Sequence, residues 1–491
     1  MLRALCKFLG KLGCSNFSEE MKNHSEITKR ISNGNGTGPS TKAITNGHLE
    51  NGDVKNGKIQ NGNVQNGSEQ NGNGVVAKKP KLIGIAGKWY DITTFIPHHP
   101  GGDVIEHFVG KDATEVFHGF HEKDVLKHRQ PVGTYSRDNV EEAGKRFADL
   151  LVVFQKKGFF KTSMPWYAMK FAITFSMFGI CIYLVTQRSE WYLHYLGGIF
   201  LAMFWQQCGF FLHDFMHNQV THNRHIDQLF GIFFGTTGVG LSASWWRDEH
   251  FVHHALTNTV DYVKEFWDPQ MKEPIWAQNS KLYPFYKDNI ESKLVRIQHY
   301  TFLPVCIIIG RLGIIIDSFK YETRIIEWVA FAAHWTWMVL LLSHLPSYWE
   351  MFVFYSIASM LQGILTVQLL VSHYAKDFFH LEDVCESQDW YRMQIQCNIN
   401  IKNPVWLDWF HGGLNFHIEH HLYPTMPRHN YHQWFVNSLP WEYLWLANGW
   451  PVGDQWFVNS LPWEYLWLAN GWPVAYQWVT SVALCLASTG K

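Results

Sequence analysis

The chain has 491 residues, of which 47% are hydrophobic, 16% are aromatic and only 17% are charged. Its 24 tryptophans and 20 tyrosines are typical of the interfacial belts of membrane proteins. The net charge of −1 excludes a general attraction to nucleic acid, so we expect no nucleic-acid partner. The eight cysteines include no CxxC pair and predict neither a disulfide framework nor a thiolate metal site.

The N-terminal segment, residues 1–80, is predicted to be a disordered tail. Asn-Gly recurs at positions 46, 51, 56, 61, 66 and 71, with polar or small residues between. Asn-Gly favours turns, and the segment has no apolar face whose burial would offset the entropy lost on ordering. We therefore predict a flexible tether without a chemical role.

A small polar domain that binds haem is predicted over residues 81–134. The sequence IPHHPGGDVIEHF places His99 in an HPGG turn whose glycines allow a planar ligand to approach closely. The sequence GKDATEVFHGFH places His121 22 residues later. Two histidines on facing elements make a bis-imidazole haem site, which suits electron transfer because no axial position remains for oxygen. Three neighbouring histidines are predicted to lie at the surface: His98, His107 and His118.

Four apolar stretches predict a mainly α, polytopic membrane domain over residues 150–432. Each is about 20 residues long, the length that crosses the hydrocarbon core of a bilayer. The predicted spans are Tyr167–Gln187, Leu193–Leu212, Ile325–Leu345 and Glu350–Val371. Residues 302–316 are apolar but contain Pro304, Gly310 and Arg311, so we predict an interfacial or re-entrant helix there.

Short connections pair the four spans into two hairpins, which leaves the other segments on one side of the membrane. The segment 213–300 carries eight Lys or Arg residues, whereas the second hairpin loop has none. The positive-inside rule therefore predicts that this side faces the cytosol. The alternative is a soluble helical protein whose apolar helices form a core.

Three histidine clusters follow the predicted spans on this side. They read HDFMH, HFVHH and HIEHH, and they contain His213, His217, His250, His253, His254, His417, His420 and His421. On a helix, positions i, i+3 and i+4 share a face, so each cluster can direct its imidazoles toward one point. Neutral nitrogen ligands suit zinc, copper, iron or nickel. We predict a dinuclear iron centre that activates oxygen; the alternative is a scatter of surface histidines.

Two acidic residues and one further histidine accompany these clusters. Asp214 and Glu419 lie inside clusters, where they could orient the ligands by hydrogen bonds or could be solvated. His334 lies within the third span and is expected to pack against a neighbouring polar group.

The whole arrangement resembles the membrane front-end fatty acid desaturases, and residues 81–134 resemble cytochrome b5, which implies a small α+β domain with His99 and His121 as the axial pair. The resemblance extends over about 350 residues, through GKWYDITTF, SWWRDEHFVHHALTN and WLDWFHGGLNFHIEHHLYPTMPRHN. It implies an oxygen-dependent oxidoreductase that contains haem b and two iron ions. Such an enzyme inserts a double bond into a long polyunsaturated acyl chain, using electrons delivered through its own haem domain.

The resemblance also assigns site residues, none of them catalytic beyond the metal ligands. It implies metal-ligand roles for His213, His217, His250, His253, His254, His420 and His421. His373, just beyond the fourth span, stands where the wider family can supply an extra ligand. His417 stands where fused front-end desaturases usually carry Gln, and we include it among the predicted metal ligands.

The partners and location implied by the resemblance are an acyl-lipid or acyl-CoA substrate, O2, cytochrome b5 reductase as electron donor, and membrane lipid. The enzyme would be a multi-pass protein of the endoplasmic reticulum membrane, with its active site and haem domain in the cytosol. One alternative is a sphingoid-base desaturase or hydroxylase on the same scaffold. Another is an inactive haem-binding membrane protein.

The C-terminal segment, residues 433–491, departs from the family pattern. The sequence QWFVNSLPWEYLWLANGWPV occurs twice without a change, at 433–452 and 455–474. A repeat of this length is too short for a solenoid. We interpret it as a recent duplication or an assembly error rather than a functional module.

Overall fold

The computed structural model describes residues 79–432 except for short gaps at 122–124, 138–141, 274, 287–289, 321–323, 375, 387–389 and 402. The predicted tail up to residue 78 and the repeat-containing segment 433–491 lie outside the described residues. The fold is mainly helical, as predicted, and it begins with a small α+β region.

The α+β region contains a three-stranded antiparallel sheet. β1 (Leu82–Ile85) pairs with β2 (Lys88–Asp91), and β2 pairs with β3 (Gly133–Thr134). Between β2 and β3 the chain forms η1 (Ile96–His98), η2 (Gly102–Phe108) and α3 (Thr114–Phe120). Ile83, Ile85 and Tyr90 from the first two strands are buried against the apolar side chains of these helices.

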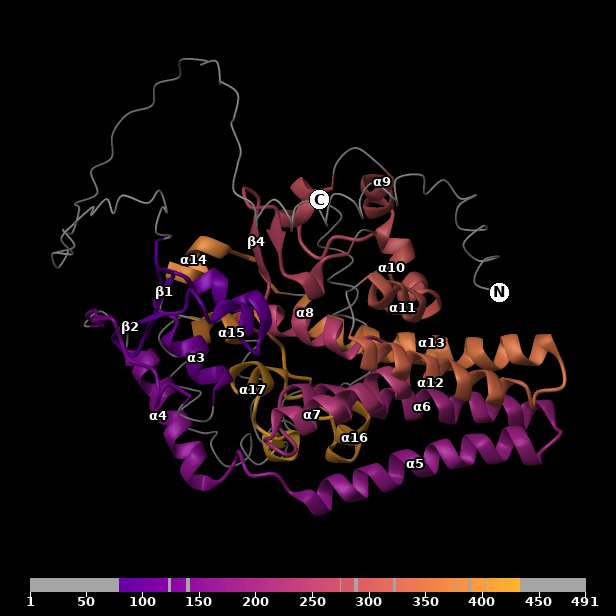
Figure 1. Ribbon diagram of the computed structural model, residues 1–491. Helices are drawn as coiled ribbons and strands as arrows, with labels where there is room; N and C mark the ends of the chain where they lie inside the picture. The colour runs from indigo at the N-terminus through magenta and orange to yellow at the C-terminus, as the bar shows by residue number, and fades with distance from the viewer. Residues whose placement is uncertain are drawn as a thin grey trace, which may run out of the picture. The chain divides into compact units, whose positions relative to one another are not determined.

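Long helices form the membrane part of the chain. α4 (Glu142–Lys157) leads into the hairpin of α5 (Met164–Gln187) and α6 (Trp191–Met216), and a second hairpin joins α12 (Ile325–Leu342) to α13 (Tyr348–Tyr374). Figure 1 shows α5, α6, α12 and α13 running side by side. By length and composition, α5, α6 and α12 are able to cross a membrane. The fourth predicted span lies in α13, and its crossing stays a prediction.

The interrupted apolar stretch forms two helices rather than one. α10 (Gln298–Ile308) and α11 (Gly310–Lys320) are bent by 70° at the break between them. This geometry is that of a broken span or a re-entrant loop. The break lies directly before Gly310, one of the residues on which the predicted interruption is based.

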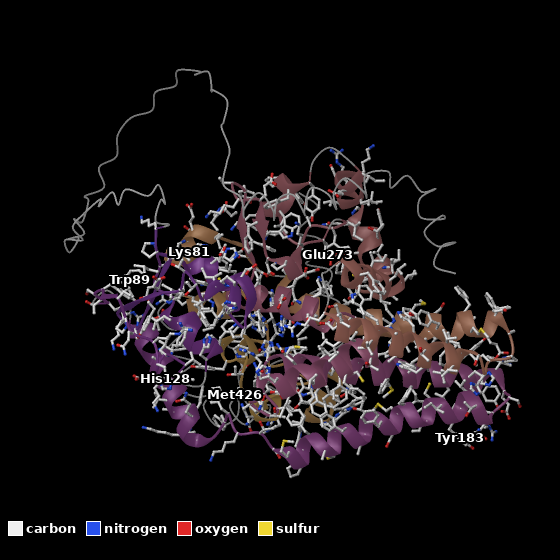
Figure 2. The ribbon with its side chains drawn as sticks, viewed as in Figure 1. Lys81, Trp89, His128, Tyr183, Glu273 and Met426 are labelled. Atoms are coloured by element: carbon white, nitrogen blue, oxygen red, sulfur yellow. The ribbon has the colours of Figure 1, made fainter. Side chains whose placement is uncertain are left out.

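The remaining elements gather at one end of the long helices. Helices in this region include α7 (Arg224–Gly231), the π-helix η3 (Ile232–Val239), α8 (Ala243–Ala255), α15 (Trp390–Cys397) and α17 (His417–Leu422). A second sheet contains β4 (Thr259–Asp261) between antiparallel β5 (Phe266–Trp267) and parallel β6 (Phe379–His380). The shorter helices are η4 (Pro269–Met271), η5 (Ser280–Phe285), α9 (Ile290–Arg296), α14 (Leu381–Glu386), η6 (Val405–Leu407), α16 (Asp408–His411) and η7 (Arg428–Asn430). Figure 2 shows Met426 at this end and Tyr183 at the other.

The turn from η3 into α8 depends on Gly240. Its φ is +89°, in the left-handed region, and a Cβ at this position would lie 2.5 Å from Nε2 of His334. His334 is buried in α12, and its Nδ1 lies 3.0 Å from the carbonyl oxygen of Thr237 in η3. His334 therefore packs against a polar group, as predicted, and this packing leaves no room for a side chain at position 240.

We expect Gly240→Ala to lower the free energy of unfolding by about 1–3 kcal/mol, because the new Cβ is strained at positive φ and displaces His334. Thermal unfolding of the detergent-solubilised chain measures this. Gly179→Ala in α5 is the matched control, since its Cβ would meet nothing within 4 Å. Equal midpoint temperatures for the two variants would contradict the prediction.

Candidate metal centre

Four helices bring the predicted histidines together. They are α6 with His213 and, just past its end, His217; α8 with His250, His253 and His254; α13 with His373; and α17 with His417, His420 and His421. All nine side chains are buried, so they are not the scattered surface histidines of the alternative interpretation. The helical spacing within each cluster therefore serves a shared interior site.

The first group contains five of these histidines. His213, His217, His250, His254 and His420 each offer a nitrogen within 4.8 Å of the others. The Nε2 atoms of His213 and His420 are 2.8 Å apart, and those of His250 and His254 are 3.0 Å apart. Nε2 of His217 has no hydrogen-bond partner among the described residues. This set offers more nitrogen ligands than one tetrahedral ion uses.

The second group contains His253, His373 and His421, whose ligand nitrogens also lie within 4.8 Å of one another. The Nδ1 atom of each faces an acceptor: the Asp268 carboxylate at 2.6 Å, the Cys397 carbonyl at 3.2 Å and the Gln394 amide oxygen at 2.9 Å, respectively. These acceptors carry no proton, so each Nδ1 must donate.

In a neutral imidazole whose Nδ1 donates, Nε2 carries the lone pair that can bind a metal. Nε2 of His253 lies 3.2 Å from Nε2 of His373, and Nε2 of His421 has no hydrogen-bond partner among the described residues. The three rings are buried, and their ligand nitrogens lie within 4.8 Å of one another, close enough to share one cation. The residues of this group thus fit a metal ion.

His417 lies beside the second group but not within it. Its Nε2 is 2.8 Å from Nε2 of His373, and its ring centroid is 4.8 Å from that of His421. Burial lowers the pKa of His417 to about 3, which keeps the imidazole neutral. Its predicted role as a metal ligand stays a prediction.

Electrostatics favour metal binding at both groups. Burial lowers the pKa of His254 and of His421 well below the usual value for histidine, and repulsion from neighbouring imidazoles lowers each further. The lowered pKa values of these two rings favour the neutral imidazole, which is the form that binds a metal.

Sequence analysis missed the side chains that orient these rings. Besides Asp268 and Gln394, Gln270 places its amide oxygen 2.8 Å from Nδ1 of His250, and the Tyr431 hydroxyl lies 3.0 Å from Nδ1 of His420. Such partners fix the tautomer and orientation of metal-binding imidazoles. No local sequence pattern marks them, because each comes from a different segment than the ring it contacts.

Both acidic residues inside the clusters are buried rather than solvated. Asp214 contacts Nε of Arg428 at 2.8 Å and the Tyr167 hydroxyl at 3.1 Å, and one of its oxygens lies 3.5 Å from Nδ1 of His213. Glu419 accepts a hydrogen bond of 2.7 Å from the side chain of Asn400. Asp214 therefore lies next to a site histidine, and Glu419 ties α17 to the segment before it.

The two histidines of the predicted haem pair, His99 and His121, face each other within the α+β region. The ring centroids of His99 and His121 are 6.4 Å apart. Each Nδ1 lies 2.9 Å from a carbonyl oxygen, of Gly102 and of Phe117 respectively, so each Nδ1 donates and each Nε2 keeps its lone pair. Burial lowers the pKa of His121 to about 4. These rings fit the axial positions of a haem.

The surface prediction for the neighbouring histidines holds only for His98, which is exposed. His107 and His118 are partly buried. The ring centroid of His107 lies 5.0 Å from that of Phe266 in β5, so His107 lies at a contact between the α+β region and the second sheet.

Comparisons with known proteins agree with this geometry. A family model described as fatty acid desaturase matches residues 190–450, and one described as cytochrome b5-like haem/steroid binding domain matches residues 68–146. A Delta(8)-fatty-acid desaturase of Borago officinalis is 30% identical over 370 residues, covering 70% of this chain and 81% of the relative. The same name is carried by a relative from Euglena gracilis, 30% identical over 70% of this chain and 84% of the relative. A Delta(6)-fatty-acid desaturase of Caenorhabditis elegans is 28% identical over 70% of this chain and 86% of the relative.

We expect Asp268→Asn to weaken metal binding at the second group by about 10–100-fold, because an amide can present its NH2 group to His253 and no longer fixes the tautomer. Bound iron after dialysis against a graded chelator series measures this. Asp227→Asn is the control, since Asp227 is equally buried but accepts its hydrogen bonds from Thr221. Equal iron retention in both variants would refute the role of Asp268.

Proposed function

Because the chain belongs to the fatty acid desaturase family, we propose that it is a front-end acyl desaturase that inserts a double bond into a long polyunsaturated fatty acyl chain. The observation that carries this proposal is the pair of converging histidine groups beside a bis-histidine haem pair. The names of the relatives, which include Delta(8), Delta(6) and acyl-lipid (9-3) desaturases, support the same type of reaction.

We propose that the two groups hold two iron ions. When bound, these ions would supply the reactivity toward O2 that removes two hydrogens from an unactivated acyl chain. The first group has five candidate ligands and the second has three, with His417 adjacent. Because the two groups offer different numbers of ligands, the two ions would differ in the number of coordination positions left open.

The surrounding residues would prepare the site in three ways. Asp268, Gln394 and the Cys397 carbonyl hold the Nδ1 protons of the second group, so that the Nε2 atoms face inward. Burial of all the rings excludes water from the oxidising site. The apolar helices α5, α6 and α12 would admit the acyl chain from the bilayer.

The proposal extends to the electron supply and the location. His99 and His121 would hold haem b, which would supply one-electron transfer from cytochrome b5 reductase as the donor. Two electrons and two protons per turnover, with two hydrogens from the substrate, convert one O2 into two waters. The eight Lys and Arg residues of segment 213–300 support a cytosolic site, and we assign the protein to the endoplasmic reticulum membrane.

Expression in a host that lacks polyunsaturated lipids, with linoleic, α-linolenic and eicosadienoic acids fed separately, tests the reaction. We expect a new double bond in at least one fed acyl chain, detected by gas chromatography and mass spectrometry of derivatised lipids. The control is the same chain with His420→Ala, which removes a member of the five-histidine group. A modified sphingoid base, or no product at normal protein level, would overturn the proposal.

We expect His417→Gln to keep activity and His417→Ala to lose about 10–100-fold of it, because Gln retains a polar atom that can reach His373 whereas Ala does not. Product yield and bound iron are measured at matched protein level. Normal iron and product in His417→Ala would show that His417 is only a neighbour of the site.

A further inference from the structure

The α+β region touches the five-histidine group through Phe120. Phe120 is the last residue of α3 and directly precedes His121, a member of the haem pair. Its ring centroid lies 6.2 Å from that of His254, and the two rings meet edge to face at 87°. A covalent connection on one side and a ring contact on the other therefore join a haem-pair histidine to a histidine of the metal group.

Trp390 in α15 holds this contact in place. Its ring centroid lies 6.5 Å from that of Phe120, and its indole Nε1 donates a 3.0 Å hydrogen bond to the carbonyl of Ala255, the residue after His254. A Cβ on Gly119 would lie 2.8 Å from the Trp390 ring and 3.2 Å from the carbonyl oxygen of Leu422. α3 thus approaches α15 and α17 so closely that position 119 has room only for glycine.

We propose that Phe120 provides the path by which electrons pass from a haem held by His99 and His121 to the five-histidine group. Trp390 is the positioning residue that fixes the orientation of Phe120. This inference rests on the proposed function. Phe120 would conduct one electron at a time from the haem side to the metal side, with no bond or proton change at Phe120 or Trp390. A flavin-containing reductase restores the electron at the haem, and two such transfers serve each O2.

The path through Phe120 consists of bonded atoms on the His121 side and one ring contact on the His254 side. Electron transfer slows steeply as the gap between groups widens, so a path of bonded atoms followed by one van der Waals contact is favoured over a path through open space. A second contact between the same two regions joins His107 to Phe266 at 5.0 Å. That pair includes neither haem-pair histidine and no member of either histidine group, so Phe266 is a matched control for loss of an aromatic contact.

The test follows haem oxidation in the full-length, detergent-solubilised chain loaded with haem and iron. Haem is reduced with dithionite, excess reductant is removed, and the protein is mixed with air-saturated buffer containing linoleoyl-CoA. The rate at which reduced haem disappears is recorded by stopped-flow absorption. His420→Ala sets the background rate at which reduced haem reacts with O2 without the metal site.

We expect Phe120→Leu to slow haem oxidation several-fold, toward the His420→Ala background, while the low-spin haem spectrum, haem potential and bound iron stay normal. Phe120→Tyr, which keeps the ring, should restore the wild-type rate, and Phe266→Leu should leave it unchanged. Wild-type rates in Phe120→Leu, or equal slowing in Phe266→Leu, would overturn the assignment. If wild-type haem oxidises no faster than in His420→Ala, the proposed function itself fails, and the inference fails with it.

Discussion

Imidazole nitrogens that face one another in a buried site are the constraint on which the rest of this structure depends. The Nε2 atoms of His253 and His373 lie 3.2 Å apart, and each Nδ1 faces an acceptor, so both Nε2 atoms are directed into the site. Gathering so many imidazoles in a buried site costs desolvation, so the surrounding fold has to hold them. Metal binding would then stabilise the folded chain, because the unfolded chain has no such preformed site.

The outer hydrogen bonds that hold the rings also join distant parts of the chain. Gln394 in α15 places its amide oxygen on His421 in α17 and donates from its nitrogen to the backbone carbonyl of His254 in α8, at 2.6 Å. Arg428, after α17, contacts Asp214 in α6. Since these groups are buried, loss of one partner would leave a desolvated polar group behind, which is costly. Site geometry and helix packing are therefore stabilised by the same residues.

Sequence analysis predicted what depends on local spacing. The three histidine clusters, the His99 and His121 pair, and the long apolar helices can each be recognised from a short stretch, because helical periodicity and turn chemistry act over a few residues. Asp268 and Gln394 could not be recognised, since their roles depend on contacts between separate segments. The same reason explains the partly buried His107, which is covered by Phe266 from β5. His417 matches its cluster in spacing, yet its nearest imidazole nitrogen belongs to His373 in another helix.

Fusion of the haem region to the membrane domain affects both how often the two meet and how they are oriented. A tether raises the effective concentration of one partner near the other, but it does not by itself set their orientation. Here the orientation follows from close contact: Gly119 admits the Trp390 ring, and Trp390 is held by the Ala255 carbonyl beside His254. The apolar side chains of both regions form a single buried cluster that includes Val116, Trp390 and Leu422. A substitution at this contact would therefore disturb the haem region and the histidine site together, because neither region buries its apolar surface there without the other.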